Sequence, residues 1–125
     1  MSDQTRLFEA GPDPFGRMWK VQFRWLQTGI SIRHADTVDV KFAVTSDGIG
    51  PEEKIIALSH PALLELTQRA GRKLTDPYCM RLAALHLRHM IETSEDMEKT
   101  LVTVSPAELT AYDQQLNGVS VASSR

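Results

Sequence analysis

Hydrophobic and polar residues alternate in two stretches in the first half of the chain. The apolar positions are odd-numbered in the first stretch and even-numbered in the second: Trp19, Val21, Phe23 and Trp25, then Val38, Val40, Phe42 and Val44. Alternation with a period of two predicts β-strands that bury one face. A short apolar run within residues 53–58 predicts a third strand. Because the connections between these strands are too short for parallel crossovers, we expect an antiparallel meander.

The spacing of apolar residues changes from two to about 3.6 after this point, which indicates helices. Each predicted helix has a recognisable start or end signal. Asp76 is expected to cap the second helix, and Arg72-Lys73, just after Gly71, suit the dipole at the end of the first. The first helix is expected from Ser59 or His60, just before Pro61, to Gly71. The second is expected from Asp76 to Glu92. The third is expected from the capping box of Ser105 and Glu108 to Asn117-Gly118.

The second predicted helix is apolar around most of its circumference. At about 100° per residue, Arg81, Arg88 and Glu92 share one narrow polar wedge. Such a helix needs cover on about three sides, so we expect it at the centre of the domain or at a subunit interface. We therefore predict a homodimer that buries the remaining apolar side of this helix together with Trp19 and Trp25.

These elements predict an α+β fold, with an antiparallel β-meander of three to four strands followed by three helices packed on one face of the sheet. The fourth strand depends on residues 101–104, whose sequence suits a sheet edge as well as a loop. The apolar positions change parity before Ile30, and either a β-bulge or a hairpin turn at Thr28-Gly29 accounts for this. The expected division is an N-terminal arm or loop at 1–16, a single domain at 17–117 and a flexible tail at 118–125. Within the arm, Leu7 and Phe8 suit a short strand.

Composition narrows the class of protein without changing the fold. The chain has 125 residues, of which 42% are hydrophobic and 24% charged, as is usual for one soluble globular domain. A formal net charge of −2 gives no basic excess, so nucleic acid is not an expected partner. The chain has one cysteine, a polar N-terminus without the apolar segment of a signal peptide, and no apolar run near the ~20 residues that span a bilayer. We expect a cytoplasmic protein that does not enter membranes.

Histidine, aspartate and cysteine provide the candidate chemistry, but no set of them completes a site. His86 and His89 lie three apart on a helix and can share a metal ion, yet no further ligands with suitable spacing accompany them. His34 and Asp36 place an imidazole beside a carboxylate in a predicted turn, without a nucleophile beside them. Cys79 lies near a helix N-terminus, but on an apolar face where cysteine behaves as a small hydrophobe. We expect no catalytic residue, no metal and no cofactor.

Tryptophans and cations are interleaved in the first predicted strand, a combination that can serve single-stranded nucleic acid. On an alternating strand, Trp19 and Trp25 point away from Lys20 and Arg24. The aromatic and cationic side chains are therefore not expected to share a surface, which also disfavours nucleic acid.

Two functions remain open on these observations. The first is a non-catalytic protein-interaction or regulatory domain that associates with itself. The alternative is a small-molecule-binding protein or small enzyme with a polar site between sheet and helices. A flat apolar patch would favour the first function, and a concave pocket with convergent polar groups would favour the alternative. The candidate binding residues are Trp19, Trp25, His34, Asp36, Arg81 and His86.

Overall fold

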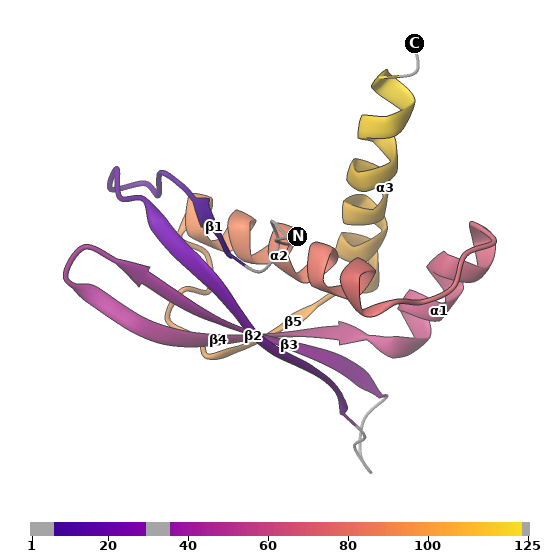
Figure 1. Cartoon of the computed structure of the whole chain (residues 1–125), viewed down its shortest axis with the longest axis horizontal. Helices are drawn as coiled ribbons and strands as arrows, with labels where there is room; N and C mark the ends of the chain where they lie inside the picture. The colour runs from indigo at the N-terminus through magenta and orange to yellow at the C-terminus, as the bar shows by residue number, and fades with distance from the viewer. Residues whose placement is uncertain (1–6, 30–35, 124–125) are drawn as a thin grey trace.

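The computed structural model describes residues 7–29 and 36–123, which form one five-stranded sheet and three helices. α2 lies across one face of the sheet, and α1 and α3 pack beside it on the same side (Figure 1). The predicted α+β class is confirmed. In chain order the elements are β1 (Leu7–Ala10), β2 (Trp19–Gly29), β3 (Thr37–Ser46), β4 (Ile49–Ser59), α1 (His60–Arg69), α2 (Asp76–Thr93), β5 (Leu101–Val104) and α3 (Pro106–Ser123).

The sheet is mixed and has one more strand than the upper limit of the prediction. Its order is β1-β2-β3-β4-β5, and the first four strands are antiparallel neighbours. β5 forms at residues 101–104 and runs parallel to β4, with Ile55 opposite Leu101 and Leu58 opposite Val104. α1 and α2 supply the long crossover that a parallel pair requires. The purely antiparallel prediction was wrong because it considered only the short connections before α1.

Both ends of the described chain extend regular structure beyond the predicted limits. Residues 7–10, expected in an N-terminal arm, form β1 and pair with β2. α3 continues through Asn117 and Gly118 to Ser123, so the predicted helix end is wrong. One interior glycine costs a helix only about 1 kcal/mol relative to alanine, which an established helix tolerates. The division into arm, domain and flexible tail stays a prediction.

The core lies between the sheet and α2. Phe42 of β3 is fully buried, and its ring makes edge contacts with Phe8 and Phe23 at centroid distances of 6.5 and 6.2 Å. The predicted central position of α2 is confirmed by its buried residues, which are Cys79, Met80, Leu82, Ala83, His86, Leu87, Met90 and Ile91. A single chain covers all of these side chains, so α2 does not need a second copy to bury them. The homodimer stays a prediction.

The change of parity in β2 comes earlier than predicted. The register with β3 shifts between Phe23 and Trp25, so the bulge includes Arg24, and Gly29 still pairs with β3. Before the bulge Trp19 points into the core and is 4% exposed, whereas Trp25 lies on the outer face of the sheet. The placement of the bulge or turn at Thr28-Gly29 was therefore wrong.

The bulge also brings an aromatic ring and a cation onto one surface. The ammonium group of Lys41 lies 5.4 Å from the centroid of the Trp25 ring. The expectation that tryptophans and cations occupy separate faces is therefore wrong for Trp25. The expected absence of a nucleic-acid partner now depends on net charge alone and stays a prediction.

Helix caps agree with the sequence in one case and differ in another. The capping box of α3 is confirmed: the Ser105 N–H donates to the Glu108 carboxylate at 3.0 Å, and the Glu108 N–H donates to the Ser105 hydroxyl at 3.1 Å. In α2 the N-cap is Thr75, whose hydroxyl accepts from the Tyr78 N–H at 3.3 Å. Asp76 was expected as the cap and instead occupies the first helical turn.

Ser105→Ala is expected to lower the free energy of unfolding by about 1 kcal/mol, because the Glu108 N–H loses its side-chain acceptor. Urea denaturation measures the change. Gln114→Ala, at an exposed position of the same helix, is the control and should change stability by less than about 0.5 kcal/mol. Equal effects of the two substitutions would contradict a capping role for Ser105.

The Asp13 carboxylate organises the turn between β1 and β2. One oxygen accepts from the backbone N–H groups of Phe15 and Arg17, both at 2.9 Å. The other accepts from Arg17 Nε at 2.8 Å and from Trp19 Nε1 at 3.0 Å. Burial alone would raise the pKa of Asp13, but these hydrogen bonds outweigh burial and hold its pKa well below the ordinary range.

Asp13→Asn is expected to lower the Tm at pH 7, because an amide replaces the two carboxylate acceptors with one. The low folded-state pKa of Asp13 means that its charge contributes stability above the unfolded-state pKa of about 3.9. That contribution is lost as the pH falls below this value, so the Tm difference between the two proteins should shrink there. Thermal unfolding between pH 7 and pH 3 measures it, with Glu9→Gln on exposed β1 as a control. A Tm difference that did not change with pH would count against the ionised carboxylate.

Candidate functional site

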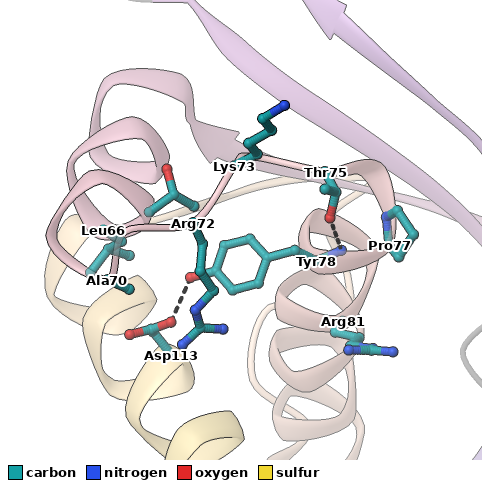
Figure 2. A pocket seen from close by; sticks show the side chains of 10 residues that line it. Leu66, Ala70, Arg72, Lys73, Thr75, Pro77, Tyr78, Arg81 and Asp113 are labelled. Carbon is teal, nitrogen blue, oxygen red and sulfur yellow. Dashed lines mark hydrogen bonds between the residues drawn. The ribbon is translucent and has the colours of Figure 1, made fainter.

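The main candidate site is a pocket at the junction of the three helices, with a volume of about 210 Å³. It is formed by the end of α1, the linker to α2, the first turns of α2, and one side of α3 (Figure 2). The alternative function drawn from the sequence placed a polar site between sheet and helices, whereas this pocket lies among helices. Its lining residues are Leu66, Thr67, Ala70, Arg72, Lys73, Thr75, Pro77, Tyr78, Arg81 and Asp113.

A helix end followed closely by a helix start places the basic residues at this pocket. After the C-cap Ala70, Gly71 adopts the left-handed conformation with φ +67°, which favours glycine. The Gly71 N–H donates to Gln68 O at 3.1 Å, and the Arg72 N–H donates to Thr67 O at 2.9 Å. The chain thereby reverses direction, so Arg72 lies next to the first turn of α2.

Tyr78 and Asp113 connect α2 to α3 across the pocket. The Tyr78 hydroxyl donates to the Asp113 carboxylate at 2.6 Å, and Figure 2 shows the ring of Tyr78 extending toward Asp113. Burial and this hydrogen bond raise the pKa of Tyr78 above its ordinary value of 10.0. The phenol therefore stays protonated at neutral pH and serves as a neutral hydrogen-bonding group.

Positive charge dominates the lining of the pocket. Arg72, Lys73 and Arg81 line the pocket together with a single carboxylate, that of Asp113, in a chain whose net charge is −2. Guanidinium groups present forked donors that match the oxygens of phosphate and carboxylate groups. The hollow therefore suits an anionic group, while Leu66 provides part of an apolar wall.

The structure separates the five predicted binding residues that it describes. Only Arg81 lines the pocket. Trp19 is in the core, and Trp25 is on the outer face of the sheet. Asp36 precedes β3, where its carbonyl accepts from the first N–H of α1 at 3.0 Å. His34 lies outside the described residues.

His86 is a core residue that belongs to a small polar cluster. Its Nδ1 lies 2.8 Å from the Tyr112 hydroxyl, and its Nε2 is buried without a partner among the described residues. Burial lowers the pKa of His86, against the opposing charge of Glu108 at 3.8 Å. His89, which is half-exposed, faces Glu95 at 3.7 Å. No group of three or more His, Cys, Asp or Glu residues in the described chain is placed to hold a metal ion, and the absence of metal stays a prediction.

Cys79 is a buried hydrophobic residue in this structure. Burial, assisted by the charge of Asp76, raises the pKa of the Cys79 thiol to about 12. The thiol is therefore protonated at neutral pH and lacks the thiolate character of a nucleophile. The interpretation of Cys79 as a small hydrophobe is confirmed.

Most of the pocket was missed at the level of sequence. Arg72 and Lys73 form a basic cluster in the sequence, but the helix dipole at the C-terminal end of α1 is sufficient to explain it. Tyr78 and Asp113 lie 35 residues apart, and no local pattern indicates their contact. The signal for the pocket that the sequence did contain was the presence of Arg72, Lys73 and Arg81 close to the start of one helix.

Three further hollows are visible, with volumes of about 480, 170 and 590 Å³. The largest lies on the outer face of the sheet and shares Lys20 and Thr45 with the 480 Å³ hollow.

In the described part of the chain, no helix is long and apolar enough to cross a membrane. No protein-family model, no curated protein and no solved structure matches this chain.

Proposed function

We propose that this protein is a non-catalytic binding domain that holds a small anionic ligand in the pocket among α1, α2 and α3. The observation that carries the proposal is the concentration of Arg72, Lys73 and Arg81 around a hollow of about 210 Å³. A concave pocket with convergent polar groups is the feature that distinguishes a small-molecule site from a flat interaction patch.

The size and walls of the pocket limit the ligand. Pockets for drug-sized ligands have volumes of roughly 300–1,000 Å³, so this hollow suits a small phosphate or carboxylate compound. Leu66, Ala70 and Pro77 supply apolar contacts, and the basic residues supply hydrogen bonds to the anionic group. The protonated Tyr78 and the buried thiol of Cys79 support binding rather than catalysis.

Calorimetric titration with inorganic phosphate and with acetate at low ionic strength tests this proposal. We expect saturable binding of at least one of these anions that weakens as salt screens the charges. Arg81→Gln should weaken it by about tenfold, because loss of one charge-assisted hydrogen bond at an exposed position costs about 1.4 kcal/mol.

Arg88→Gln is the matched control. Arg88 lies on the same helix, but it is outside the pocket and its guanidinium lies 5.1 Å from the Phe8 ring centroid. Its substitution should leave the affinity unchanged. Failure of both anions to bind, or equal losses in the Arg81 and Arg88 variants, would contradict the proposal.

A further inference from the structure

The outer face of the sheet carries a row of apolar side chains that no helix of the described chain covers. The strand register places Trp25 opposite Lys41, Lys41 opposite Ile55, and Ile55 opposite Leu101. These four residues, the Trp25 row, form a straight line across β2, β3, β4 and β5. Leu101 is 57% exposed, and Trp25 and Ile55 are partly exposed.

Lys41 does not interrupt the apolar character of the Trp25 row. Its ammonium group lies over the Trp25 ring and pairs with the Glu53 carboxylate at 2.9 Å. The charge of Lys41 is thus used within the chain, and its methylene stem adds apolar surface to the row.

Charges flank the Trp25 row on opposite sides of the sheet. Lys20 and Arg24 belong to β2, and neither forms an ion pair within the described residues. Glu53 belongs to β4 and lies in the row of Gln22 and Ala43, next to the Trp25 row. Arg24 on β2 and Glu53 on β4 therefore carry opposite charges on either side of β3.

We propose that a second copy of this chain covers the outer face, sheet against sheet, about a two-fold axis parallel to the strands. Such an axis places β2 of one copy over β4 of the other. Trp25 then packs on the partner's Ile55, and Arg24 faces the partner's Glu53. Each of these contacts occurs twice. On the axis β3 lies over β3, so the two Lys41 side chains meet there, each with its charge paired to Glu53 of its own chain. The packing corresponds to the aligned sheet-on-sheet class.

A second copy fits the outer face better than a nucleic acid does. Glu9, Asp39 and Glu53 balance Lys20, Arg24 and Lys41 on this face. A polyanion requires a basic excess, whereas a two-fold pair requires only that opposite charges meet across the axis. This proposal is independent of the anion pocket, which lies on the helical side of the sheet.

Light scattering on a sizing column tests the dimer. The wild-type protein is expected at twice its chain mass of 14.0 kDa, and Trp25→Thr is expected at 14.0 kDa, because threonine suits a strand but removes the central aromatic contact. Leu64→Thr, at a 37% exposed position of α1, is the control and should remain dimeric. A monomeric wild-type protein, or a Trp25→Thr variant that dimerises as well as wild type, would overturn the proposal.

A mixing experiment tests the axis itself. Arg24→Glu and Glu53→Arg each place like charges at both symmetric contacts, so each variant alone is expected to be monomeric. In an equimolar mixture the mixed dimer pairs Glu with Arg at both contacts, so a mass of twice 14.0 kDa should return. Circular dichroism of each variant checks that it is folded. Variants that stay dimeric alone, or a folded mixture that stays monomeric, would overturn the arrangement.

Discussion

Leu87→Ala is expected to lower the free energy of unfolding by about 2–5 kcal/mol. The Leu87 side chain is 0% exposed and lies in the core between α2 and the sheet. Its truncation leaves a cavity that a closely packed interior fills only in part. Domains of this size are stable by about 5–15 kcal/mol, so the variant should unfold at a much lower urea concentration.

The same substitution distinguishes a core position from an interface position. Because one chain alone buries Leu87, the loss of stability should be as large for a monomeric Trp25→Thr background as for the wild-type background. Leu64→Ala removes the same atoms from an exposed position and should change stability by less than about 0.5 kcal/mol. Dissociation of a dimer by Leu87→Ala without a loss of monomer stability would show that this side chain contacts a second copy instead.

Elements whose stability is set by local pattern were predictable from the sequence. In β3 the alternation of apolar and polar residues matches the observed burial, because Val40, Phe42 and Val44 all face the core. The capping box of α3 forms between Ser105 and Glu108 with both hydrogen bonds in place, since its partners are only three residues apart. Such features depend on neighbours along the chain and need no knowledge of the tertiary fold.

Features that depend on distant neighbours were not predictable in the same way. The bulge at Arg24 is fixed by the register of β2 against β3, although Leu26 already breaks the odd-numbered alternation. The direction of β5 is fixed by the crossover through α1 and α2. The anion pocket requires α3 to bring Asp113 beside Tyr78, a contact over 35 residues. The dipole at the end of α1 is enough to explain why Arg72 and Lys73 are basic. For this reason the two residues did not indicate a pocket.

Acidification from pH 7 to pH 5 is expected to destabilise the folded protein through His86. Burial lowers the pKa of His86 below its ordinary 6.5, and the opposing charges of Glu108, Glu95 and Asp96 do not reverse this, while His89 adds to the lowering. Above pH 6.5 the imidazole is neutral in both states and has no effect on the folding equilibrium. Below pH 6.5 the unfolded chain binds a proton that the folded chain excludes. The free energy of unfolding then falls by up to about 1.4 kcal/mol per pH unit until the pH reaches the folded-state pKa.

Urea denaturation of the wild-type protein and of His86→Gln at pH 7, 6 and 5 measures this effect. Glutamine can keep a hydrogen bond to the Tyr112 hydroxyl, which stays protonated because burial and the charges of Glu108 and Glu95 raise the pKa of Tyr112 to about 12. His86→Gln should therefore flatten the pH dependence, whereas His89→Gln, at a 45% exposed side chain, should keep most of it, because burial is the main cause of the lowered pKa of His86. The Asp13 carboxylate titrates at lower pH and contributes little in this range. An unchanged slope in His86→Gln would mean that His86 accepts a proton in the folded state as readily as in the unfolded chain.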